Sequence, residues 1–172
     1  MNKEKELAKR KLLRLQNDDY STTGVYFITI CTKDRRCILS RVLGTENFGY
    51  PKIELTEYGK IADKYIKQLN EFYDHISVKS YVIMPNHIHL LLHIKGDGQS
   101  GTPAPNVMRA NSAFSQFIST FKRFCNKEYG KNIWQTRAND HIIRNQDDYE
   151  EHLRYIYENP IRWHSDELYV NE

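Results

Sequence analysis

Residues 75–94 constrain the fold most, because they form two apolar runs joined by a very short connection. Residues 75–84, HISVKSYVIM, are rich in β-branched and aromatic side chains and predict a strand. Pro85 and Asn86 predict a tight turn, and residues 87–94, HIHLLLHI, predict the returning strand. The sequence therefore predicts an antiparallel hairpin near the middle of the chain.

Further elements flank this hairpin on both sides. Residues 24–32, GVYFITICT, predict a buried strand, and residues 133–145, IWQTRANDHIIRN, predict a short strand with loop character. Thr56 can cap a helix over residues 57–72, whose apolar stripe is Ile61, Tyr65 and Leu69. A second helix, ending near Gly130, has the apolar face Phe114, Phe117, Ile118, Phe121 and Phe124 or Cys125.

The last helix has clear boundaries in the sequence. Asn145 can cap it, and Asp147 and Asp148 in its first turn oppose the positive end of the helix dipole. Pro160 ends it, because the residue before a proline disfavours helical geometry.

The predicted order is β-α-β-β-α-β-α, which indicates an α+β fold. Its first six elements have the order of a ferredoxin-like sandwich, an antiparallel sheet with two helices on one face. The length of 172 residues predicts a single domain over residues 1–172. Within it, residues 1–20 predict a basic N-terminal arm, and the Gly- and Pro-rich residues 96–112 predict a flexible loop.

Charge and cysteine content narrow the setting of the protein. The net charge is only +3, which is compatible with an anionic partner without requiring one. The three cysteines form no CxxC pair, so a disulfide framework is not expected and a reducing compartment is. No apolar run approaches the ~20 residues of a membrane span, and the N-terminus lacks the apolar core of a secretory signal. We therefore expect a cytoplasmic protein without a membrane partner.

His87 and His89 form the sharpest chemical motif. Strand side chains alternate, so both histidines point to one face while Ile88 points to the other. Two imidazoles ~6.6 Å apart along a strand can converge on a divalent metal. Two histidines on a solvated strand face fit the same motif, so His-x-His alone leaves both interpretations open.

The last helix presents a second candidate. Tyr149, Leu153, Ile156 and Tyr157 form an apolar stripe, so Tyr149 and Tyr157 are expected to be packed. Tyr155 lies off this stripe and shares a face with the polar residues Asp148, Glu151, His152 and Asn159. Its phenol fits either a half-exposed ring or a nucleophile presented to a site, with the Asn159 amide one turn away.

Basic side chains supply candidate phosphate contacts. They follow the first strand, occupy the predicted solvent side of the second helix and precede the last helix: Arg35, Arg36, Lys122, Arg123, Lys127 and Arg144. Each fits a solvated surface charge as well as a phosphate contact.

Together these motifs resemble a known family. PNHIHLLL after an apolar strand, WQ…HIIRN and YIYENPIRW, with RKLLRLQNDDYSTTGVYFITICTKDRRC before them and DELY after them, are similar to the single-tyrosine HUH transposases. The nearest branch is the REP-associated tyrosine transposases. The resemblance covers nearly the whole chain, although Ala138-Asn139-Asp140 stand where many relatives have an aromatic pair.

The resemblance implies a function and a set of site residues. The family has a ferredoxin-like fold and cuts and rejoins single-stranded DNA through a 5′-phosphotyrosine. Its nucleophile falls on Tyr155, and its metal ligands fall on His87, His89 and Asn159, for Mg²⁺ or Mn²⁺. The implied partner is single-stranded or hairpin DNA, and the family includes homodimers as well as proteins that act alone.

Two alternatives stay open. One is a non-catalytic nucleic-acid-binding module of the same fold. The other is a metal-dependent nuclease that uses water as its nucleophile.

Overall fold

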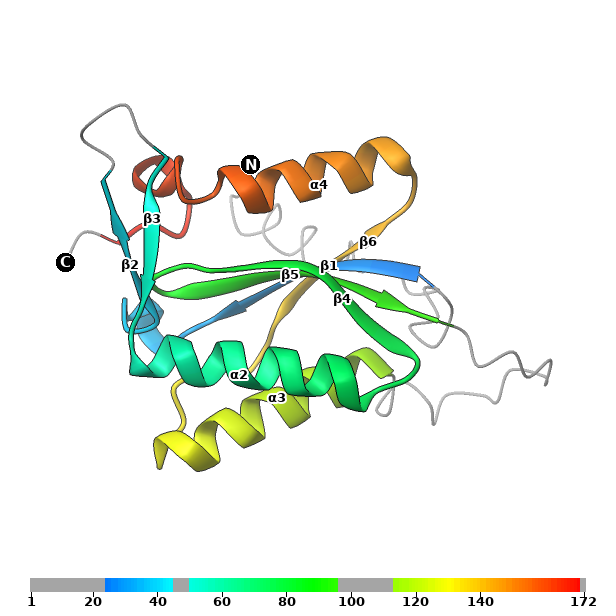
Figure 1. The fold of residues 1–172 in the computed structure, drawn as a ribbon, viewed down its shortest axis with the longest axis horizontal. Coiled ribbons are helices and arrows are strands. Elements are labelled where there is room, and N and C mark those ends of the chain that lie inside the picture. Colours follow the sequence, from blue (N-terminus) through cyan, green and yellow to red (C-terminus); the bar gives the residue numbers. More distant parts are fainter. Residues whose placement is uncertain (1–23, 45–49, 96–112, 171–172) are drawn as a thin grey trace, which may run out of the picture.

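The structure, a computed structural model, describes residues 24–44, 50–95 and 113–170 (Figure 1). The expected N-terminal arm, residues 1–20, and the expected loop, residues 96–112, lie outside the described residues. No helix among the residues described is long and apolar enough to cross a membrane.

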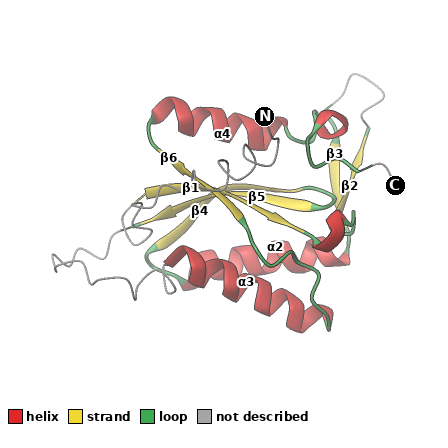
Figure 2. Cartoon of the chain, turned by 180° about the vertical axis from the view of Figure 1, so that it is seen from behind, coloured by secondary structure: helices red, strands yellow, loops and turns green. Residues whose placement is uncertain are grey.

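A four-stranded antiparallel sheet forms the centre of the fold. Its strands lie in the order β4 (Ile76–Ile83), β5 (His87–Ile94), β1 (Gly24–Cys31) and β6 (Asn139–Ile143). Helices α2 (Glu57–Phe72) and α3 (Ala113–Tyr129) cover one face, and α4 (Gln146–Glu158) lies across the other (Figures 1 and 2). This is an α+β, ferredoxin-like arrangement with an additional C-terminal helix, as the sequence predicted.

The two central strands divide their side chains between the two faces. Ile28 of β1 and Ile88 of β5 are fully buried in the core under α2 and α3. Phe27 and Leu91 belong to a smaller core on the α4 side. Because successive strand residues alternate, His87 and His89 must also face α4.

The helices begin and end where the sequence predicted, but they bury somewhat different stripes. The Thr56 hydroxyl accepts a hydrogen bond from the Gly59 N–H at 3.2 Å and caps α2. The residues of α2 that are most buried are Ala62, Ile66 and Leu69, whereas Ile61 and Tyr65 are only partly buried. Helix α3 buries Phe117, Ile118, Phe121 and Cys125 and is followed by Gly130 at a φ of 69°.

A second, two-stranded sheet was not predicted. Strands β2 (Ser40–Leu43) and β3 (Lys52–Leu55) form a hairpin between β1 and α2. Two short one-turn helices were also missed, η1 (Lys33–Arg35) after β1 and η3 (Trp163–Ser165) after α4.

The segment leading into this hairpin binds the start of α2 to the β4–β5 turn. The Leu39 carbonyl accepts hydrogen bonds from the Thr56 N–H and hydroxyl, and the Leu39 N–H donates to the Pro85 carbonyl. Gly59 permits this approach, since a Cβ there would lie 2.0 Å from the Leu39 carbonyl oxygen.

Candidate active site

Two histidines at the start of β5 form the base of the site. His87 and His89 are buried at 0% and 2% exposure, and their ring centroids are 4.5 Å apart. His89 Nδ1 is hydrogen-bonded to Thr29 Oγ1 of the neighbouring strand at 2.9 Å. Ile88 lies on the opposite face, in the core under α2 and α3. The two imidazoles therefore lie side by side on the α4 face of the sheet, and their binding of a metal stays a prediction.

Asn86 fixes the tautomer of His87. Its Nδ2 donates hydrogen bonds to the Leu168 carbonyl at 2.7 Å and to the Arg35 carbonyl at 3.3 Å. Carbonyls only accept, so the amide orientation is determined and Oδ1 faces His87 Nδ1 at 2.7 Å. Nδ1 must therefore carry the proton, which leaves a lone pair on Nε2.

Burial keeps both histidines neutral. It lowers the pKa of His87 to about 4, although Asp166 and the Asn159 amide oppose the shift. Burial, together with the positive charge that a protonated His87 would carry, lowers the pKa of His89 well below its ordinary value. Both Nε2 atoms are buried and have no hydrogen-bond partner within the described part of the chain. Neutral imidazoles with unpaired nitrogens are the form that binds metals.

Asn159 and Asp166 approach the histidines from the C-terminal side. Asn159, at the C-terminal end of α4, is 1% exposed and donates a hydrogen bond from Nδ2 to Asp166 Oδ2 at 2.7 Å. Its Oδ1 is buried and has no partner among the described residues. One carboxylate oxygen of Asp166 and one nitrogen of each histidine lie within 4.8 Å of one another.

Asp166 is the residue that sequence reasoning missed. It directly follows η3 and lies outside any long helix or strand, so no side-chain periodicity in the sequence could predict where it points. The only signal was the DELY sequence that begins with Asp166 and forms part of the family resemblance. The expected metal ligands, His87, His89 and Asn159, carry no negative charge in their neutral forms, whereas the structure brings the Asp166 carboxylate next to the two histidines.

Tyr155 lies beside this cluster. Its ring centroid is 5.1 Å from that of His89 and 5.9 Å from that of Phe27. The hydroxyl donates a hydrogen bond to Asp166 Oδ2 at 3.2 Å. Burial and the negative charge of Asp166 raise the pKa of Tyr155 to about 12, so the resting phenol is protonated.

A cavity of about 310 Å³ gives access to the cluster. Tyr155, His89 and Asp166 line it, so a phosphate that enters can reach the phenol and the candidate ligands together.

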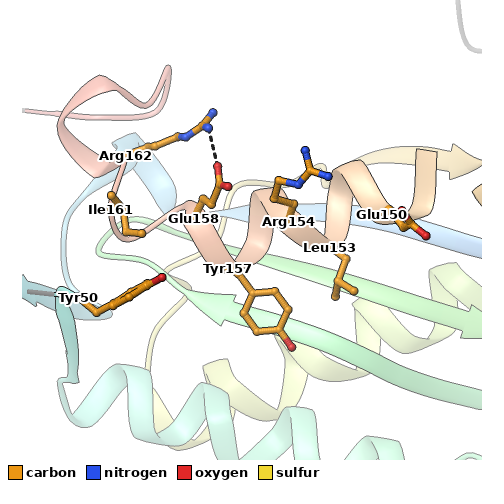
Figure 3. Close-up of a pocket in the computed structure, with 8 residues that line it drawn as sticks. All are labelled: Tyr50, Glu150, Leu153, Arg154, Tyr157, Glu158, Ile161 and Arg162. Carbon is orange, nitrogen blue, oxygen red and sulfur yellow. Dashed lines mark ion pairs between the residues drawn. The ribbon is translucent and has the colours of Figure 1, made fainter. Parts of the chain in front are cut away.

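The prediction that Tyr157 is packed in the core is wrong. Tyr157 is 68% exposed rather than packed, whereas Ile156 is buried and Tyr149 and Leu153 are partly buried. Tyr157 lines a larger groove of about 700 Å³, together with other residues of α4 and with Tyr50. Figure 3 shows the side chains that line this groove. Tyr155 does not line this groove, so the two tyrosines serve different surfaces.

The residues present fit a divalent metal. Three buried acceptor atoms, on His87, His89 and Asn159, have no hydrogen-bond partner among the residues that the structure describes, and leaving such atoms unpaired is costly. The Asp166 carboxylate next to them supplies the negative charge that a hard cation such as Mg²⁺ or Mn²⁺ favours.

The six candidate DNA-contacting residues are distributed over both faces of the sheet. Arg35 lies beside the site, where its guanidinium donates to the Glu167 carbonyl at 3.4 Å. Arg36 is exposed next to it, and Arg144 is exposed at the junction of β6 and α4. Helix α3, which carries Arg123 and Lys127, covers the face of the sheet opposite α4, the helix that carries Tyr155 (Figure 1).

Lys122 does not occupy the solvent side of α3 as expected. Its ammonium is partly buried and donates hydrogen bonds to the carbonyls of Gln135 at 2.7 Å and Thr136 at 3.3 Å. Burial lowers its pKa. These contacts bind α3 to the segment that leads into β6.

Relatives of the chain were found among proteins and solved structures. An "Uncharacterized protein" of Haemophilus influenzae is 27% identical over 175 residues, covering 94% of each chain. A "Putative REP-associated tyrosine transposase" of the same organism is 30% identical over 152 residues, covering 84% of this chain and 74% of its own. A REP-associated tyrosine transposase of Escherichia coli is 27% identical over 144 residues, covering 83% and 70%.

The structural comparison agrees. A REP-associated tyrosine transposase bound to a REP hairpin has a TM-score of 0.61 and 24% identity, covering 87% of this chain and 74% of its own. This likeness supports the fold. No family model matches the chain. The site geometry, the fold and the relative at 30% identity agree, and the chain belongs to the REP-associated tyrosine transposase family.

Proposed function

We propose that this protein cuts and rejoins single-stranded, hairpin-forming DNA through a covalent bond to Tyr155. The single observation that carries the proposal is the position of the phenol, hydrogen-bonded to Asp166 and next to His89 in an accessible cavity. A tyrosine placed with unpaired imidazole nitrogens and a carboxylate is poorly explained by core packing. It fits a nucleophile beside a metal site.

The proposed reaction is transesterification of a DNA phosphodiester. The Tyr155 oxygen attacks the phosphorus, the new O–P bond replaces the bond to the 3′ oxygen, and the phenolic proton is balanced by protonation of that oxygen. The products are a 5′-phosphotyrosine and a free 3′-hydroxyl. Because the phosphoester bond is kept in the intermediate, a 3′-hydroxyl can later reverse the reaction without ATP.

The residues of the chain prepare this attack in distinct ways. Asp166 orients the Tyr155 hydroxyl, and the aromatic contacts with Phe27 and His89 hold the ring. His87, His89 and Asn159 would hold Mg²⁺ or Mn²⁺, with Asp166 adding charge. When bound, such an ion polarises a phosphate oxygen and stabilises the charge that develops on it.

Hairpin DNA is the proposed partner. A structural relative is bound to a REP hairpin, and an accessible, bendable backbone suits attack by a side chain in a cavity. Arg35 and Arg36 are proposed to contact phosphates near Tyr155, and Arg144 to contact them at the N-terminal end of α4. Arg123 and Lys127 are proposed to contact a more distant part of the DNA. Lys122 is proposed to act indirectly, through the segment that it holds.

Incubation with a labelled single-stranded hairpin and Mg²⁺ or Mn²⁺ tests the proposal. We expect a protein–DNA complex that survives denaturing electrophoresis, and much less of it with a blunt duplex of the same sequence. Cleavage without such a complex would indicate water as the nucleophile. Binding without cleavage in either metal would indicate a non-catalytic module. Both outcomes would overturn the proposal.

A further inference from the structure

A second group of metal-ligating side chains lies where β6 meets α4, apart from the cluster that contains Asp166. It consists of His141 on β6 and of Asp148 and His152 on α4. One ligand atom from each lies within 4.8 Å of the others. Asp148 and His152 are four residues apart, so they share one face of the helix and can reach the same ion.

The donor atoms converge on one carboxylate. His141 Nε2 lies 3.0 Å from both carboxylate oxygens of Asp148. His152 Nδ1 lies 3.0 Å from Asp148 Oδ1 and 2.8 Å from the main-chain carbonyl oxygen of Asp148. The two imidazole rings are stacked, with centroids 4.6 Å apart and planes inclined by only 15°. Two imidazoles and one carboxylate form a donor set typical of Zn²⁺ and other first-row transition ions.

The surrounding structure holds these donors in place. The Asn145 side chain accepts a hydrogen bond from the Asp148 N–H at 2.9 Å and fixes the start of α4. The Arg144 N–H donates to Asp148 Oδ2 at 3.0 Å. Burial acts to raise the pKa of Asp148, but this hydrogen bond and those from His141 outweigh it and lower the pKa. The Phe27 ring packs against His152, at 4.6 Å between centroids.

Access for an ion is open on one side. The His141 side chain is 48% exposed, whereas those of Asp148 and His152 are 17% and 20% exposed. Solvent molecules can therefore complete the coordination of an ion bound by the three side chains. Without an ion, the His141 Nε2 proton faces the Asp148 carboxylate, and the His152 Nδ1 proton faces both this carboxylate and the Asp148 main-chain carbonyl. Binding of a cation by these nitrogens would displace the two protons.

We propose that His141, Asp148 and His152 bind a transition-metal ion of the Zn²⁺ type. This site is structural, because it joins an edge strand to the helix that carries Tyr155. His152 precedes Tyr155 by three residues and lines the same cavity. A bound ion would therefore hold this part of α4 against the sheet.

Metal stoichiometry tests the proposal. The full chain is dialysed against micromolar Zn²⁺ at neutral pH, and bound zinc per chain is measured for the wild type and for His141→Ala, Asp148→Asn and His164→Ala. His164 is exposed and outside both clusters, so it is the matched control. We expect His141→Ala and Asp148→Asn each to lose one equivalent relative to the wild type, and the control to lose none.

This difference does not depend on the proposed catalytic site. If His87 and His89 also bind zinc, the count falls from two to one, and if they do not, it falls from one to zero. Zn²⁺ should also raise the melting temperature of the wild type more than that of His141→Ala. Since His141 lies on the surface, its substitution leaves the fold testable. Equal stoichiometry in His141→Ala and the wild type would overturn the proposal.

Discussion

Tyr155 and Asn159, one helical turn apart on α4, donate hydrogen bonds to the same oxygen, Oδ2 of Asp166, at 3.2 and 2.7 Å. A single carboxylate from the C-terminal segment therefore positions both the proposed nucleophile and a proposed metal ligand. The helix supplies their spacing, and the carboxylate fixes their direction.

Replacing Tyr155 by Phe should abolish the covalent DNA complex, because the variant lacks the attacking oxygen. The lost hydrogen bond is worth only about 1 kcal/mol, so the fold and hairpin binding should be retained. Denaturing electrophoresis measures the complex, and a filter-binding assay measures affinity. Tyr157→Phe is the control and should react normally, since Tyr157 lies in the groove outside the site. A covalent complex in Tyr155→Phe at the wild-type rate would disprove the assignment.

Asp166→Asn should weaken divalent-ion binding by about tenfold, because it removes the carboxylate charge next to two neutral histidines. The midpoint of a Mn²⁺ titration of adduct formation measures the effect. Glu167→Gln is a matched control, since Glu167 lines the same cavity but is not part of the histidine cluster. Equal Mn²⁺ midpoints for Asp166→Asn and Glu167→Gln would contradict a role for Asp166 at the metal.

Asn86→Ala should disturb the site without touching a ligand. It removes the acceptor that holds the proton on His87 Nδ1 and leaves the Leu168 carbonyl without its donor. We expect metal affinity to fall about 10- to 100-fold and the free energy of unfolding to fall by about 1–3 kcal/mol. Nitrogen-detected NMR of the imidazoles reports the tautomer directly. An unchanged His87 tautomer in the variant would show that Asn86 does not fix it.

The partly buried hydrogen bond of Tyr81 should make the free energy of unfolding fall at high pH. The Tyr81 hydroxyl donates to Asp63 Oδ1 at 2.6 Å and joins β4 to α2, and burial and this hydrogen bond raise its pKa. Above the ordinary tyrosine pKa of about 10, the unfolded chain loses this proton before the folded chain does, so the free energy of unfolding must fall as the pH rises.

Urea denaturation of the wild type and Tyr81→Phe can isolate this contribution. At about pH 9, Tyr81→Phe should be less stable by roughly 1 kcal/mol, because it lacks the hydrogen bond. At about pH 11, the difference should shrink, since only the wild type has this hydroxyl to ionise. A difference that is constant with pH would contradict the assignment.

The main elements could be predicted because strong local signals mark them. The β5 boundaries follow from an apolar run after a Pro-Asn turn, and the start of α4 follows from its Asn145 cap. Strands β2 and β3 could not be predicted in this way. Each has four residues, and all but Ser40 are exposed or only partly buried, so neither produces a clear apolar pattern.

The arrangement of the site residues could be predicted where those residues lie on a regular strand or helix. Strand alternation places His87 with His89, and helical spacing places Tyr155 above Asn159. Tyr157 was misplaced because its position at the edge of the stripe resembles a core position, whereas only Ile156 is fully covered in that turn. Asp166 reaches the histidines through an irregular turn, and such a path depends on tertiary contacts rather than on a period.

The contact between Gly59 and Leu39 also limits which amino acids position 59 can accept. The Leu39 carbonyl fills the space where a side chain at position 59 would begin, and the Leu39 N–H is bonded to Pro85, two residues before His87. An alanine at position 59 would therefore displace the Leu39 peptide. Because that peptide is hydrogen-bonded to Pro85, the displacement would reach the β4–β5 turn and change the orientation of the His87 imidazole. Position 59 is thus expected to tolerate no other amino acid in an active protein, although it lies in α2, on the face of the sheet opposite the proposed active site.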